Sequence, residues 1–161
     1  MIKKVISVIL GIILFGIIGI LITQASTTIH EEIHVIVAKL FGADAGINKI
    51  DVYTGSSSYE FVKDVSKSYD ILIAMAPSLI LFFVAWYIWE SFGENSIMRA
   101  VALVMWLYSV FPSSFPILPG SDFYYAIQVG ANPIFMWIIW IFISGVVWYN
   151  IIEEIEDRKI F

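Results

Sequence analysis

The chain has 161 residues, of which 60% are hydrophobic and 14% are charged, and its mean hydropathy is +0.87. Soluble domains contain about 25% charged residues, so this composition argues against one and predicts that lipid is the solvent for most of the surface. The net charge of −5 and the scattering of the nine Lys and Arg along the chain argue against a nucleic-acid-binding surface.

The N-terminal part of the chain contains two predicted helices. An apolar run over residues 5–22 is about as long as a membrane-spanning helix requires. A cleavable signal peptide is the alternative for this run, because small residues follow it. A second helix is expected over residues 26–41, where Thr28 and Glu31 fit a capping box at the start and Gly42 fits the end.

Residues 43–68 form the most polar stretch of the chain, and a β-hairpin is predicted within it. Strand-like residues over 47–53 and 57–62 flank Thr54-Gly55-Ser56, which is typical of a turn. The apolar runs that follow predict two further helices, over residues 69–89 and 96–111.

A break rich in proline over residues 112–122 precedes a short predicted helix over 121–130 and a last apolar helix over 134–152. Irregular backbone is tolerated at membrane depth only where protein or water surrounds it, so the break is expected to line an interior cavity. The sequence therefore predicts an all-α multi-pass membrane protein with about five transmembrane helices and a small β-hairpin near 47–62, in a single membrane-embedded domain over residues 1–161.

The positions of the lysines predict an orientation in the cell membrane. Two lysines precede the first span, and four lie in or beside the loop over residues 43–68; they are Lys3, Lys4, Lys39, Lys49, Lys63 and Lys67. The positive-inside rule then places both the N-terminus and this loop in the cytoplasm. Five spans would leave the C-terminus outside, which the cations Arg158 and Lys159 oppose.

The sequence His30-Glu31-Glu32-Ile33-His34 has the spacing of a zinc site. Histidines four residues apart on a helix share one face, so both imidazoles can reach one Zn²⁺. Glu31 lies on the flank of that face, where its carboxylate can accept a proton from a water held beside the metal. Glu32 points away from this face. The alternative is a capped helix start near the membrane interface, with both histidines solvated.

A third protein ligand is needed for a catalytic zinc, and with no cysteine in the chain it would be a carboxylate. Asp122 is the only charged residue between Arg99 and Glu153, and it directly follows the proline-rich break. A lone carboxylate at membrane depth is a functional candidate. The alternative is that Ser121 or Asp122 only caps the short helix that follows.

These motifs resemble the site-2 protease family of intramembrane zinc metalloproteases. The stretch from His30 to Gly42 is similar to that family's H-E-x-x-H-x-x-x-A-x-x-x-G helix, with Ala38 and Gly42 in register. Ala76-Pro77 is similar to the family's Gly-Pro motif, with Ala in place of Gly and Ile80 in place of the usual Asn. The stretch from Phe115 to Phe123 resembles the proline-rich break in which the family places its third metal ligand, an Asp.

The resemblance implies a compact core form without a PDZ-like insertion, with residues 26–130 as the catalytic core. His30, His34 and Asp122 would hold Zn²⁺, and Glu31 would act as the general base in cleaving peptide bonds within transmembrane segments of a membrane-protein or peptide substrate. The hairpin over 47–62 could offer an edge strand to the unwound substrate. Two alternatives stay open: another membrane zinc hydrolase that takes Glu90 or Glu94 as third ligand, and a non-catalytic membrane scaffold of the same fold.

Overall fold

The structure is a computed structural model that describes residues 2–50, 55–61, 66–92 and 95–157. It is mostly helical, with one small antiparallel sheet. The elements in chain order are helix α1 (Ile2–Leu40), strands β1 (Ala43–Ile50) and β2 (Gly55–Phe61), helices α2 (Lys67–Ser91) and α3 (Ser96–Val104), the π-helix η1 (Met105–Val110), and helices α4 (Phe111–Ser114), α5 (Asp122–Gln128) and α6 (Pro133–Asp157).

Helix α1 runs without interruption through the break that the sequence predicts between residues 22 and 26, so the prediction of two helices there is wrong. The hydroxyls of Thr23, Thr27 and Thr28 each donate a hydrogen bond to the carbonyl four residues earlier in the same helix. The hydroxyl groups of these threonines therefore find hydrogen-bond acceptors within the helix, and the helix does not end at them. For the same reason Thr28 does not form the predicted capping box with Glu31.

The predicted hairpin is confirmed, with β1 beginning earlier than expected. Strands β1 and β2 pair in antiparallel register, with an irregularity between Ile47 and Lys49. Gly55 and Ser56 belong to β2, whereas Thr54 of the predicted turn lies outside the described residues. The buried Ala38 of α1, Ala43 of β1 and Ile73 of α2 form a small core that fastens the hairpin to both helices. At the junction, Gly42 ends α1 with a φ of 83°, a value that glycine adopts without steric cost.

The main core lies among α2, the η1 region, α5 and α6. Its largest buried side chains include Trp106, Phe82 and Phe123. The predicted helices over 69–89 and 134–152 are confirmed as α2 and α6. The helix predicted to stop at residue 111 instead continues through η1 to Ser114. The break therefore begins three residues later than predicted, because a π-turn accommodates Pro112, which lacks the N–H for an ordinary helical bond.

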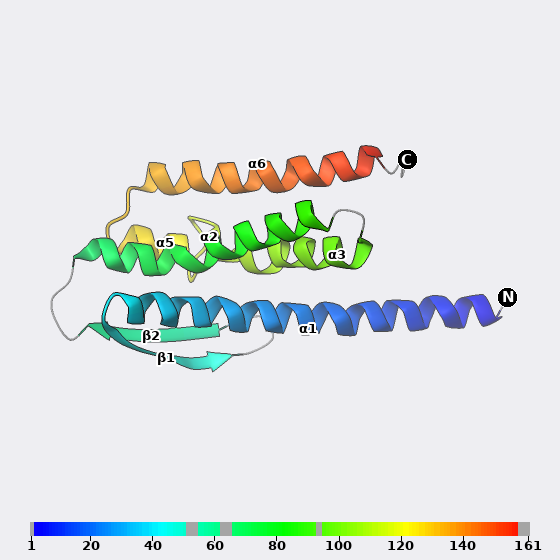
Figure 1. Cartoon of the computed structure of the whole chain (residues 1–161), viewed down its shortest axis with the longest axis horizontal. Coiled ribbons are helices and arrows are strands. Elements are labelled where there is room, and N and C mark those ends of the chain that lie inside the picture. Colours follow the sequence, from blue (N-terminus) through cyan, green and yellow to red (C-terminus); the bar gives the residue numbers. More distant parts are fainter. Residues whose placement is uncertain (1, 51–54, 62–65, 93–94, 158–161) are drawn as a thin grey trace.

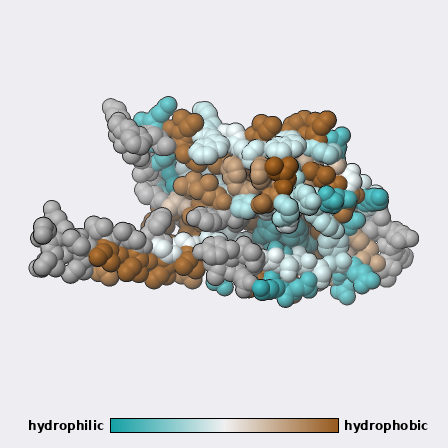
Figure 2. All heavy atoms as spheres, turned by 180° about the vertical axis from the view of Figure 1, so that it is seen from behind, coloured by the Kyte–Doolittle hydropathy of each residue, from teal (hydrophilic) through white to brown (hydrophobic). Residues whose placement is uncertain are grey.

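Three helical segments in the described part of the chain are long and apolar enough to cross a membrane: Lys67–Ser91, Ile97–Ser114 and Pro133–Glu154. A fourth apolar stretch, over residues 5–22, lies in the N-terminal half of α1, and the start of this helix projects beyond the other helices (Figure 1). Figure 2 shows hydrophobic residues on this projecting part, whereas hydrophilic residues gather on the hairpin and in the hollow beside it.

The arrangement of the helices bears on the predicted orientation. The start of α1 and the end of α6 lie at one end of the molecule, and the hairpin lies at the other (Figure 1). If α1 crosses the bilayer, the N-terminus and the loop over 43–68 lie on opposite sides, so they do not share the cytoplasm as the sequence predicts. Among the cations in the described part of the chain, Lys39, Lys49 and Lys67 belong to the hairpin end and Lys3, Lys4 and Arg99 to the other, so the positive-inside rule favours neither orientation.

Single cysteines introduced into this cysteine-free chain test the arrangement. The exposed residues Asp44 of β1, Ser91 at the end of α2 and Glu156 of α6 are each replaced by Cys, and a membrane-impermeant maleimide is applied to intact and to opened cells. We expect Cys at 91 and 156 to react from the same side of the membrane and Cys at 44 from the opposite side. Labelling of positions 44 and 156 from one side would contradict this topology.

Candidate metal centre

Helix α1 places His30, Glu31 and His34 on the side that packs against the rest of the protein. His30 and Glu31 are buried, with 8% and 6% of their surface exposed, whereas Glu32 is exposed. The two imidazole rings lie one helical turn apart, with their centroids 5.0 Å from each other and their planes at 82°. The spacing of the motif thus has the predicted effect: the pair shares one face and Glu32 lies away from it.

Asp122 reaches this pair as the first residue of α5. The preceding residue, Ser121, is the N-cap: its hydroxyl accepts a hydrogen bond from the backbone N–H of Tyr124 and donates one to the carbonyl of Phe115. Gly120 turns the chain into this cap with a φ of 88°. Because Ser121 satisfies the helix end, the Asp122 carboxylate is not needed there and points toward α1.

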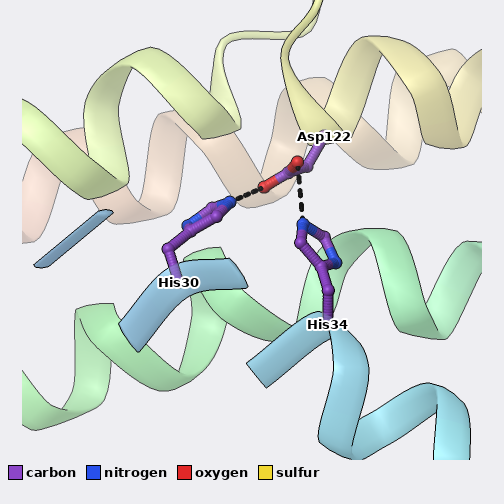
Figure 3. Close-up of side chains that lie close together, drawn as sticks. All are labelled: His30, His34 and Asp122. Atoms are coloured by element: carbon purple, nitrogen blue, oxygen red, sulfur yellow. Dashed lines mark ion pairs between the residues drawn. The ribbon is translucent and has the colours of Figure 1, made fainter. Parts of the chain in front are cut away.

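The three side chains converge (Figure 3). One carboxylate oxygen of Asp122 lies 3.1 Å from Nε2 of His30, and the other lies 3.3 Å from Nε2 of His34. One ligand atom from each residue lies within 4.8 Å of the others, so the group could hold a metal ion. Two ligand atoms about 2.1 Å from a tetrahedral zinc are about 3.4 Å apart, which agrees with both contacts of Asp122.

The hydrogen bonding of His34 shows that this group needs a positive charge. Nδ1 of His34 lies 2.9 Å from the carbonyl oxygen of Ile73, which can only accept, so Nδ1 carries a hydrogen. In neutral imidazole the lone pair then sits on Nε2, facing a carboxylate oxygen of Asp122. Two acceptors face each other at this distance only if a proton or a metal ion lies between them. A nitrogen–nitrogen–oxygen donor set of this kind suits zinc.

Glu31 lies next to the metal group against strand β2. A Cβ atom added to Gly55 would lie 2.4 Å from Cγ and 2.7 Å from Oε1 of Glu31. Such distances are far below van der Waals contact, so the absence of a side chain at position 55 makes room for Glu31. The sequence predicts only a turn at Gly55, because the contact with Glu31 joins residues 24 positions apart in sequence.

A cavity of about 720 Å³ opens onto His30, Glu31, His34 and Asp122. Its wall is rich in neutral hydroxyl groups and includes no Lys or Arg among the described lining residues, which are supplied mainly by α1, β2, the break and α5. Burial, and then the neighbouring Tyr125 and Asp70, raise the pKa of the Tyr59 hydroxyl in this wall above its usual value of 10.0. Tyr59 therefore stays a neutral donor throughout the physiological range.

Two contacts to the metal group come from α2, where the sequence predicts no site residue. The Ile73 carbonyl meets His34, and the Ser78 hydroxyl donates a hydrogen bond of 3.2 Å to Asp122. A buried apolar residue and a lone serine carry no chemical signature in a sequence. The nearest signal is Pro77, which was noted only for its likeness to a family motif.

Metal analysis of detergent-purified protein tests the ligand set. We expect about one divalent metal per chain in the wild type and a loss of most of it in His34→Ala and Asp122→Ala, because two protein ligands rarely retain a catalytic metal. Glu90→Ala is the matched control: Glu90 accepts a hydrogen bond from Trp86 on an exposed surface of α2. Loss of metal from the Glu90 variant with retention in the Asp122 variant would contradict this site.

Comparison with known proteins finds no match to any family model, to any curated protein or to any solved structure. The function is therefore inferred from the geometry of the residues around Asp122 and from the cavity into which they open.

Proposed function

We propose that this protein is a zinc-dependent intramembrane endopeptidase that hydrolyses peptide bonds in transmembrane segments of other proteins. The observation that carries the proposal is the convergence of Asp122 with His30 and His34 beside the buried Glu31. The motif supplies two metal ligands and a base from one helix. The third ligand is Asp122, which lies 88 positions beyond His34. Helix α2, which is apolar enough to cross a membrane, contacts both His34 and Asp122, which supports a reaction at membrane depth.

In the proposed reaction His30, His34 and Asp122 would hold the metal. A bound zinc supplies Lewis acidity, which polarises the peptide carbonyl and lowers the pKa of a coordinated water. Glu31 accepts a proton from the attacking water and returns it to the amine nitrogen as the C–N bond breaks. Its burial against Gly55 holds the carboxylate in one place.

The cavity fits a stretch of unwound peptide. Its volume of about 720 Å³ lies within the range of about 300–1,000 Å³ that is usual for ligand sites. Peptide groups released from a helix need new hydrogen-bond partners, and the hydroxyls of Ser57 and Tyr59 in the wall can donate and accept. Within the described sheet β2 pairs only with β1, and its residues 55–59 line the cavity, so its outer edge is available to an extended substrate.

The alternative of a zinc hydrolase with a glutamate as third ligand gains no support. Glu90 lies 17 residues beyond Ile73 on α2, which corresponds to about 26 Å along the helix. Glu94 lies outside the described residues. A non-catalytic scaffold of the same fold is the outcome that the next experiment is designed to detect.

Replacement of Glu31 by Gln tests the base. We expect Glu31→Gln to retain zinc and to cleave at least about 100-fold more slowly, because general-base catalysis contributes a factor of that order. The measurement is cleavage of a panel of co-expressed single-span membrane proteins, with zinc content measured on the same preparations. Glu32→Gln removes the same charge from the exposed neighbour and should leave both the cleavage rate and the zinc content unchanged. Zinc-loaded wild type that cleaves no member of the panel would favour a scaffold.

Replacement of Gly55 by Ala tests the position of the base. The added methyl group overlaps Glu31, so we expect zinc to stay bound while cleavage falls by about 10- to 100-fold, the effect of misplacing a catalytic group by about 1 Å. Gly46→Ala is the control in the paired strand, because a Cβ at Gly46 meets nothing within 4 Å. Equal cleavage by the two variants would show that this contact does not position Glu31.

A further inference from the structure

Helix α2 contacts two of the three candidate metal ligands, His34 and Asp122, through its residues Ile73 and Ser78. We propose that Pro77 and Ser78 are positioning residues: they hold His34 and Asp122 in the orientations that bind the metal, without touching it themselves. This inference rests on the metal centre of the proposed function and does not require that the protein cleaves peptides.

Pro77 acts by leaving a backbone carbonyl without its usual partner. In an α-helix the N–H of residue 77 would bond to the carbonyl of residue 73, but proline has no N–H. Ile73 has 0% of its surface exposed, so water cannot replace the missing donor, and a buried carbonyl without a partner is costly. Nδ1 of His34 supplies the hydrogen bond at 2.9 Å.

The consequence for His34 is a fixed ring and a fixed tautomer. A histidine that donates from Nδ1 to a carbonyl presents the lone pair of Nε2 to a metal, and such outer partners also set the orientation of the ring. Nε2 of His34 is indeed the atom that faces Asp122, at 3.3 Å. With an ordinary residue at position 77, its N–H would compete with His34 for the same oxygen.

Ser78 acts on the third ligand. Its side chain is completely buried, and its hydroxyl donates to Oδ2 of Asp122 at 3.2 Å because a carboxylate can only accept. The Ser113 hydroxyl lies 2.8 Å from that of Ser78 and can donate to it. The same Oδ2 lies 3.1 Å from Nε2 of His30, while Oδ1 faces His34. The bond from Ser78 thereby opposes rotation of the carboxylate away from either histidine.

The π-helix η1 brings Ser113 to this position. It contains one wider turn, in which the N–H of Phe111 bonds to the carbonyl of Trp106. Adding one residue to a turn rotates everything that follows by about 100° relative to a regular α-helix. Without η1, Ser113 would face a different direction and Ser78 would lose its partner. Segments of this kind are frequent at functional sites.

Zinc affinity measured by competition with a chelator tests the inference. Removal of outer partners of metal ligands typically weakens metal binding by about 10- to 100-fold, and we expect a loss of this size in both Pro77→Ala and Ser78→Ala. The absorption spectrum of the Co²⁺-loaded protein should also change in both variants, because ligand orientation sets it. A purely structural role of either residue would leave that spectrum as in the wild type.

The controls separate positioning from unfolding. Ser144→Ala removes another buried serine hydroxyl, on α6, and Pro133→Ala removes the proline that begins α6; both should bind zinc as the wild type does. Pro77→Ala adds a helical hydrogen bond, so its Tm should equal or exceed that of the wild type while its affinity falls. Affinities of both α2 variants within threefold of wild type would overturn the inference. Wild type that binds no zinc would overturn the metal centre itself.

Discussion

The carboxylate of Asp122 lies about 3 Å from two imidazole nitrogens in a largely buried setting. One of these nitrogens, Nε2 of His34, carries a lone pair because its ring donates from the other nitrogen to Ile73. Such a group is stable only with a shared proton or a bound metal ion, since a buried charge without a partner is strongly unfavourable. The break over residues 115–121, the cap at Ser121 and the end of α1 all serve to bring these three side chains together.

Much of the local structure could be predicted from the sequence. The i, i+4 spacing of His30 and His34 fixes a shared face on any helix, and Gly42 marks the end of that helix. Asp122 could be proposed because a single charge stands in a long apolar region after a break. These features depend on residues close together in the chain, or on the cost of a charge at membrane depth, and both can be read without coordinates.

Other features depend on contacts that the sequence does not encode locally. The threonines of α1 could either cap a helix or bond back into it, and only the packing of the whole helix decides between them. Ser78 matters because it contacts Asp122, and Gly55 matters because it contacts Glu31. Both partners lie far away in the chain. The effect of Pro77 is less visible still, since it works through the backbone carbonyl of an apolar residue four positions earlier.

The uninterrupted course of α1 has a consequence for how the site would lie in a bilayer. The contact between His34 and Ile73 aligns α1 and α2 in antiparallel directions. Measured from this contact, the middle of the apolar residues 5–22 lies about 20 Å along the axis from the middle of α2. If both helices cross a bilayer, a hydrocarbon layer of about 30 Å cannot be centred on both, and tilt of α1 or local thinning of the bilayer would absorb the mismatch. In that case the depth of the candidate metal group below the lipid surface would depend on membrane thickness through the continuous helix α1.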